Sequence, residues 1–189
     1  MMLVRHQNKL RLLNLTNEQP TNSFVELDPI PKETSYCLLN SLIDVPGKQN
    51  FESAVLNDES LEKKFVVSCF DSTIGNPAFR VHNVESLFNR EVSRSFMVKY
   101  ERVLRANPTK SVKDIIKFLF IGTKAKDPKV EARKDDLGGF RVVGPYGTGV
   151  YLSELASLVN ADAFPNANAN PRTILFCAVI VGDYCSLPP

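Results

Sequence analysis

An α+β fold is predicted by three features of the sequence: a long apolar run, an amphipathic helix, and strands and helices that do not alternate regularly. The run TILFCAVIV (Thr173–Val181) is bounded by Pro171 and Gly182, which is typical of a strand covered on both faces. The helix is predicted over 90–104, where apolar side chains recur every three or four residues. The lack of a βαβ rhythm favours α+β over a doubly wound sheet.

Composition indicates a globular chain with a core and almost no charge bias. The chain has 189 residues, of which 43% are hydrophobic, and its 23 basic and 21 acidic side chains leave a net charge of +2. It lacks the basic stripe of a nucleic-acid-binding protein, so nucleic acid is not indicated as a partner. The length fits one domain with an extension.

The terminal and cysteine patterns favour an intracellular protein, in the nucleus or the cytoplasm, with no membrane partner. Basic residues interrupt the N-terminal leucines, so the start is a poor signal peptide. The longest apolar run, Ile174–Val181, is shorter than the roughly twenty residues of a membrane span. The four cysteines lack C-x-x-C spacing and lie far from both histidines, so no metal site is predicted. Cys177, inside the apolar run, is interpreted as a small buried hydrophobe.

The N-terminal part is interpreted as an extension without regular structure. Residues 1–55 form this irregular extension, and residues 56–189 form the folded domain. After the N-terminal leucines, its one compact apolar segment is Thr34–Ile43. Prolines, which punctuate a chain, recur along it at Pro20, Pro29, Pro31 and Pro46.

The first elements of the domain are a strand and a helix. Lys63–Phe70 mixes β-branched and aromatic residues, so it fits either a strand or a short helix. Phe79–Val84 predicts a strand, in which His82 is half exposed. The helix over 90–104 follows, and Asn107-Pro108 ends it.

The second half of the domain begins with a capped helix start at Ser111. Lys117–Thr123 suits a buried strand that stops at its glycine, and Asp127–Asp136 is charged, as in a loop or a short helix. Ser153–Asn160 predicts a short helix with its first serine as the cap.

A glycine-rich stretch, GPYGTGVYLS at 144–153, holds three of the nine glycines of the chain. Such a bend either lets the backbone approach a ligand closely or makes an ordinary tight turn between two elements. It is not a dinucleotide fingerprint, because it lacks the G-x-G-x-x-G order.

Four segments in this order resemble the catalytic domain of the poly(ADP-ribose) polymerase (PARP) family, the diphtheria-toxin-like ADP-ribosyltransferases. Leu119–Thr123 (LFIGT) is similar to the family's L-F-H-G-T, and Tyr146–Ser153 to its Y-G-x-G-V-Y-F-A. Arg172–Tyr184 matches a following family strand, and Val84–Asn89 its V-E-x-I-x-N helix entry. The resemblance covers about residues 60–187.

The resemblance implies a fold of two packed, antiparallel-rich sheets flanked by short helices. It also implies that the glycine turn leads into the wall of a pocket for the nicotinamide of NAD. The catalytic glutamate of the family lies on a later strand, so the chain is expected to be incomplete at its C-terminus and to lack C-terminal strands. Leu152-Ser153 after the tyrosine is similar to the plant SRO branch of the family.

Four positions carry over from the family as NAD-binding residues. Gly122 matches the glycine whose backbone holds the nicotinamide amide, and Thr123 completes that motif. Tyr151, the candidate catalytic position, matches the tyrosine that packs against the nicotinamide ring. Phe164 lies near the position of a second stacking aromatic.

Two other positions depart from the family pattern. Ile121 occupies the position of the histidine that binds the adenosine-side ribose, and Val159 that of a serine that contacts the carboxamide. One lost polar group costs about 2.7–4 kcal/mol in a transition state, and an unpaired buried hydroxyl costs about 1–3 kcal/mol of binding. Both residues are expected to line one apolar pocket, unless they are ordinary core residues. Glu154 is expected to face solvent.

Two functions are therefore expected. The first is a PARP-like domain that is inactive or weak and that serves in protein interaction or regulation, without a cofactor. The alternative is an active mono-ADP-ribosyltransferase that uses NAD as its substrate, releases nicotinamide and modifies a protein acceptor. Whether the chain is an enzyme stays open at this point.

Overall fold

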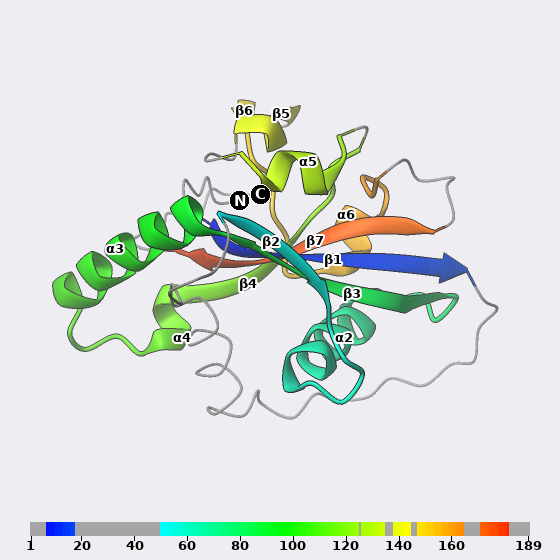
Figure 1. Ribbon diagram of the computed structural model, residues 1–189, viewed down its shortest axis with the longest axis horizontal. Helices are drawn as coiled ribbons and strands as arrows, with labels where there is room; N and C mark the ends of the chain where they lie inside the picture. Colours follow the sequence, from blue (N-terminus) through cyan, green and yellow to red (C-terminus); the bar gives the residue numbers. More distant parts are fainter. Residues whose placement is uncertain are drawn as a thin grey trace.

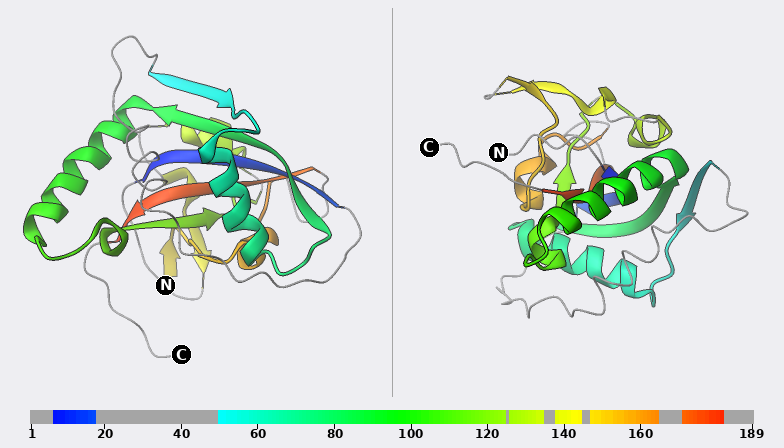
Figure 2. Two further views of the ribbon diagram at one scale, coloured as in Figure 1. Left: turned by 90° about the horizontal axis from the view of Figure 1, so that it is seen from below. Right: turned by 90° about the vertical axis from the view of Figure 1, so that its left-hand side faces the viewer.

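The structure is a computed structural model that combines one antiparallel sheet with short helices (Figure 1). It describes the backbone of residues 7–17. It also describes residues 50–124, 126–134, 138–144, 147–164 and 171–181 with their side chains. The five strands of the sheet lie in the order β2-β3-β1-β7-β4 and can be followed side by side in Figure 2. Their bounds are β1 Gln7–Asn17, β2 Phe51–Val55, β3 Phe79–Asn89, β4 Ile116–Ile121 and β7 Arg172–Ile180.

Helices and a short hairpin cover this sheet. Above it in Figure 1 lie a short helix and the two-stranded hairpin, and below it lies α2. The hairpin consists of β5 Val142–Gly144 and β6 Gly147–Gly149. The helices are α2 Leu61–Thr73, α3 Arg90–Ala106, α4 Val112–Ile115, α5 Pro128–Ala132, the 3₁₀ helix η1 Gly138–Phe140 and α6 Ala156–Asn160.

This architecture agrees with the predicted α+β class and with the predicted antiparallel strands, but the second of the two predicted sheets is small. Within the described residues, every strand pairing is antiparallel, and the second sheet is only the hairpin of two three-residue strands. None of the described helices is both long enough and apolar enough to pass through a bilayer.

The expectation of an irregular segment over residues 1–55 is wrong for two parts of it. Gln7–Asn17 is β1, which pairs with β3 on one side and with β7 on the other, in the middle of the sheet. Phe51–Val55 is the edge strand β2. A central strand needs two neighbours that are distant in sequence, so a pattern of prolines and leucines does not reveal it. Thr34–Ile43 and Tyr184 lie outside the described residues.

The ambiguous segment Lys63–Phe70 is helical, as part of α2. Ser60 caps the helix, because its Oγ accepts a hydrogen bond from the Lys63 N–H at 3.2 Å. The buried side chains Phe65, Val66 and Phe70 follow helical spacing and point at the sheet. The predicted strand at Phe79–Val84 is confirmed as the first part of β3.

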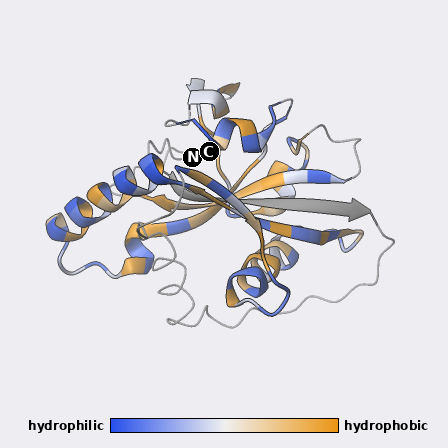
Figure 3. Ribbon diagram, viewed as in Figure 1, coloured by the Kyte–Doolittle hydropathy of each residue, from blue (hydrophilic) through white to orange (hydrophobic). Residues whose placement is uncertain are grey.

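The two predicted helices around Pro108 are confirmed. The predicted helix over 90–104 is α3, whose hydrophobic and hydrophilic residues alternate along the ribbon in Figure 3. Ser111 begins α4, where its N–H and O–H both donate to the Asp114 carboxylate, at 2.8 and 2.7 Å.

The predicted cap at Ser153 is wrong, because α6 begins three residues later, at Ala156. Ser153 instead pairs with Phe120, and its Oγ accepts from the Leu155 N–H at 2.9 Å. The first amide of α6 is bound by a different helix: the Ala156 N–H donates to Thr73 Oγ1 at the end of α2, at 3.1 Å. A tertiary contact therefore replaces the local cap.

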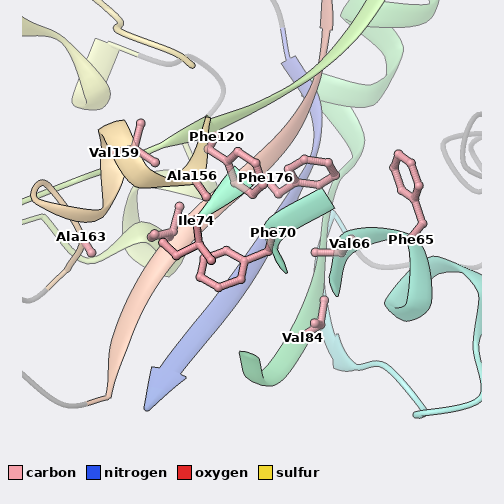
Figure 4. Packing of buried hydrophobic residues seen from close by; sticks show 11 residues of the cluster. Phe65, Val66, Phe70, Ile74, Val84, Phe120, Ala156, Val159, Ala163 and Phe176 are labelled. Carbon is pink, nitrogen blue, oxygen red and sulfur yellow. The ribbon is translucent and has the colours of Figure 1, made fainter. Parts of the chain in front are cut away.

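The two faces of the sheet carry separate hydrophobic clusters, because side chains alternate along each strand. β7 is buried on both faces, as the apolar run predicts. Figure 4 shows the cluster on the α2 face, which consists of Phe65, Val66, Phe70, Ile74, Val84, Phe120, Ala156, Val159, Ala163, Ile174 and Phe176. The cluster on the α5 face consists of Leu87, Leu119, Ile121, Ala132, Phe140, Val150, Leu175, Cys177, Val179 and Val181.

Candidate functional site

The end of β4, next to the predicted site residue Gly122, pairs with the segment that follows Tyr151. The Phe120 N–H donates to the Ser153 carbonyl at 2.8 Å, and the Ser153 N–H donates back at 3.1 Å. If this antiparallel register continued for two more residues, it would pair Gly122, which follows Phe120, with Tyr151, which precedes Ser153. Strand alternation directs the Gly122 N–H and C=O to the same edge as those of Phe120, and within the described residues neither group forms a hydrogen bond. The ladder is therefore broken between Gly122 and Tyr151.

Asp162, in the turn after α6, lies directly against Gly122. A Cβ atom at Gly122 would lie 2.5 Å from the Asp162 Cβ and 2.7 Å from its carbonyl carbon and oxygen, so the position requires glycine. The Lys124 N–H donates to the Asp162 carbonyl at 2.6 Å, and the Lys124 Nζ lies 3.1 Å from Asp162 Oδ1. Lys124 has φ of 52°, in the left-handed region that a residue with a side chain rarely adopts. The turn is thus fixed beside the Gly122 peptide.

Tyr151 forms the base of the glycine hairpin. Its hydroxyl donates to the Gly147 carbonyl at 2.7 Å. A Cβ at Gly144 would lie 2.2 Å from the Tyr151 Cζ, so the ring fills the space that a side chain would need. Gly147 has φ of 96°, which only glycine adopts without strain. The glycines therefore make a tight turn that receives the tyrosine ring, the second of the two explanations considered for this stretch.

The other two predicted site residues are Thr123, which follows Gly122, and Phe164, two residues after Asp162. Thr123 is buried, and its Oγ1 has no hydrogen-bond partner among the residues that the structure describes. Phe164 is half buried, and its backbone extends the sheet through a bridge to Thr173. The residue in contact with Gly122 is thus Asp162. No sequence signal identifies Asp162, because its position depends on where α6 ends.

Ile121 and Val159 do not line one wall, contrary to the expectation. Ile121 is 1% exposed and packs in the α5-face cluster, whereas Val159 is 8% exposed and packs with Phe120 in the α2-face cluster. Neighbouring residues of a strand point to opposite faces, which separates Phe120 and Ile121. Both departures from the family pattern are therefore core residues here.

The V-E-x-x-x-N segment holds α5 against the sheet. Asn89 Nδ2 donates to the carbonyls of Ala132 and Lys134, both at 3.1 Å, at the end of α5. Its Oδ1 accepts from the first amides of α3, so one side chain joins two helices. Four residues earlier, on the same face of β3, buried Glu85 pairs with Lys129 at 2.6 Å. The residues of this motif therefore hold α3 and α5 in place, and none of them is assigned a role in a reaction.

Two further carboxylates, Glu154 and Glu131, each have an oxygen close to a lysine ammonium group. Glu154 faces solvent, as expected, with Oε1 3.6 Å from the Lys117 Nζ. Glu131 is buried; its Oε1 accepts from Lys134 at 2.7 Å, and its Oε2 is the atom nearest to a Cβ built on Gly139. Within the described residues, Oε2 has no hydrogen-bond partner.

The described cysteines and acidic residues give no sign of metal or thiol chemistry. Burial raises the pKa of Cys69 to about 11, and that of the fully buried Cys177 also lies well above the usual range. Both thiols are therefore protonated at neutral pH. In the part of the chain that the structure describes, no three His, Cys, Asp or Glu side chains gather as metal ligands would.

Comparison with known proteins finds a related sequence. The chain is 28% identical over 138 residues to a protein of Dictyostelium discoideum described as a probable poly(ADP-ribose) polymerase. The match covers 71% of this chain, which spans 40% of the length of the relative. No family profile and no solved structure matches. The similarity supports a PARP-like sequence, and it does not bear on the plant SRO branch.

Proposed function

We propose that this chain is a divergent PARP-like ADP-ribosyltransferase domain that keeps a contact for the nicotinamide end of NAD. Its turnover is weak or absent, and its role is protein interaction or regulation inside the cell, in the nucleus or the cytoplasm. The similarity to the Dictyostelium protein and the four resembling segments support the family. The proposed ligand follows from the geometry at the end of β4.

The observation that carries the proposal is the broken ladder at Gly122. A primary carboxamide carries an NH2 group with two N–H donors and a C=O acceptor, so one N–H and the C=O can pair with a peptide C=O and N–H as a neighbouring strand would. Gly122 offers this pair at the edge that faces Tyr151. The carboxamide of nicotinamide is such a ligand, and the aromatic residue opposite suits its ring.

Ile121 is the reason to propose weak turnover. Its side chain is buried among aliphatic residues and cannot replace the histidine hydrogen bond to a ribose hydroxyl. An unpaired hydroxyl costs about 1–3 kcal/mol of binding, roughly a tenfold to hundredfold loss. NAD should therefore bind mainly through nicotinamide.

The second candidate is an active mono-ADP-ribosyltransferase that acts on a protein; the relative, described as a probable poly(ADP-ribose) polymerase, supports ADP-ribosyl transfer only in general. This reaction breaks the bond between nicotinamide and ribose through a cationic, oxocarbenium-like state that a carboxylate stabilises. Of the described acids, Asp162 lies closest to Gly122, but it is already paired with Lys124. The geometry therefore favours the first candidate.

Calorimetry with nicotinamide and NAD tests the ligand. We expect both to bind, and Gly122→Ala to abolish binding because the new Cβ displaces the Asp162 turn. Gly75→Ala is the matched control, since its Cβ would meet nothing within 4 Å and any backbone strain arises away from the site. If titration of the wild type with either ligand up to millimolar concentration releases no heat of binding, the proposal is refuted. Labelled NAD tests the second candidate: label transferred to the chain or to a lysate protein would favour it.

A further inference from the structure

We propose that Asp162 makes this site selective for a cationic pyridine ring, so that it binds NAD⁺ in preference to NADH. The inference rests on the proposed function, because it assumes that the nicotinamide carboxamide pairs with Gly122. It adds a specificity-determining residue that the family motifs do not mark.

The position of Asp162 follows from its contacts with two residues of the β4 end. Its Cβ would touch any side chain at Gly122, which places the start of its side chain at the flank of that peptide. Its carbonyl is held by the Lys124 N–H, and its own N–H donates to Val159 at 2.9 Å. The backbone of the turn is therefore fixed at both ends, and the carboxylate cannot move far from Gly122.

The charge of the ring distinguishes the two forms of the dinucleotide. In NAD⁺ the nicotinamide ring carries a positive charge, and in NADH the ring is neutral, while the carboxamide, both riboses and the diphosphate stay the same. A carboxylate beside the ring favours the charged form. Contacts to all other parts of the ligand cancel when the two affinities are compared.

Lys124 limits the size of this preference. Its Nζ lies 3.1 Å from Asp162 Oδ1, and 61% of its side chain is exposed, so a bound ring must compete with a mobile ammonium group. Charge pairs at such exposed sites are weak, and a preference of about two- to fivefold is expected. It should shrink as salt is added.

The test measures dissociation constants of NAD⁺ and NADH, at low salt, for the wild type and three variants. Asp162→Asn should remove the preference while it keeps the backbone contacts of the turn. Lys124→Met should increase the preference, because the carboxylate loses its competitor. Glu154→Gln is the matched control: it removes an exposed, lysine-paired carboxylate from the segment before α6 and should leave the preference unchanged.

The outcomes separate the two proposals. Loss of the preference in Asp162→Asn alone supports the inference. Equal dissociation constants of NAD⁺ and NADH for the wild type overturn the inference, and so does a ratio of these constants that is unchanged in Asp162→Asn. Nicotinamide binding at Gly122 would still stand in both cases. If neither dinucleotide nor free nicotinamide binds the wild type, the proposed function fails, and this inference fails with it.

Discussion

The α2 face and the α5 face of the sheet are held together by different kinds of contact. On the α2 face, aromatic rings pack against one another. The ring centroids of Phe65 and Phe118 lie 5.1 Å apart, and those of Phe120 and Phe176 lie 4.7 Å apart. On the α5 face, the cluster is mostly aliphatic, and the short helix is attached by Asn89 and by the Glu85–Lys129 pair.

This difference separates stability from function. Apolar packing is non-directional and strong in sum, so the aromatic cluster of the α2 face contributes a large share of the folding free energy. Single polar contacts contribute about 0.5–1.5 kcal/mol each, so the cover of the α5 face can open locally at a lower cost. The neighbours of Tyr151, Val150 and Leu152, pack on this face, whereas the Asp162 turn beside Gly122 follows α6, which packs in the α2-face cluster. A ligand at the Gly122 edge would therefore lie between a firmly packed turn and a less rigidly held hairpin.

Truncation of an aromatic residue on the α2 face should have the largest effect. Phe120 is 1% exposed and contacts both Phe70 and Phe176. Phe120→Ala should lower the free energy of unfolding by about 3–5 kcal/mol, as measured by urea denaturation. Phe120→Leu, which keeps most of the volume, should lose far less. A loss below about 1 kcal/mol for the alanine variant would mean that this face is not the main core.

Asn89 tests the polar cover of the other face. Asn89→Ala removes a helix cap, worth about 1 kcal/mol, and two further hydrogen bonds to α5, worth about 0.5–1.5 kcal/mol each. Asn89→Asp should keep the cap and lose only the bonds to α5, because a carboxylate has no N–H. Hydrogen exchange should then show faster opening of Pro128–Ala132 in both variants. Unchanged exchange there would contradict the clamp.

The sequence predicts contacts within an element better than contacts between elements. The spacing of apolar residues reveals α3 and β7, because helical and strand periods are local. β1 is missed because its neighbours in the sheet are far away in sequence, the nearest pair being Asn17 and Phe79 (79 − 17 = 62 residues). The cap of α6 is missed for the same reason, since Thr73 comes from another helix.

The candidate site divides in the same way. The motif residues Gly122 and Tyr151 are found from the sequence, and the bridge between Phe120 and Ser153 joins the two segments that carry them. Ile121 and Val159 are noticed, but their separation depends on which face of the sheet each one meets. The position of Asp162 depends on how the turn after α6 closes on Gly122, which no periodicity encodes.

Substitutions of the hairpin glycines should have an effect of intermediate size, and they test whether the Tyr151 hairpin contacts the ligand. Gly144→Ala should displace the Tyr151 ring and weaken nicotinamide binding, with a loss of about 1–3 kcal/mol in unfolding free energy from overpacking. Gly147→Ala strains a backbone at φ of 96° by roughly 1–2 kcal/mol but meets no atom within 4 Å. Calorimetry should therefore separate two variants of similar stability. Equal binding by both would show that the tyrosine ring does not contact the ligand.

The smallest expected effect concerns Asp71, a charged residue of α2 that follows the buried Phe70. Partial burial raises the pKa of Asp71, and the nearby Arg80 opposes this shift. A raised carboxyl pKa means that the folded state binds the proton more tightly, so stability decreases as pH rises from about 3.8, the ordinary value, through the raised pKa. Because the residue is exposed at the surface, the effect is small.

Asp71→Asn should therefore be slightly more stable than the wild type at neutral pH, with the difference vanishing in acid. Asp114→Asn should show the opposite sign: hydrogen bonds from Ser111 lower the pKa of Asp114, so its contribution is present at neutral pH and is lost as pH falls through that lowered pKa. Urea denaturation at a series of pH values measures both. If the two variants shifted stability in the same direction, partial burial of Asp71 and hydrogen bonding of Asp114 would not be what distinguishes these carboxylates.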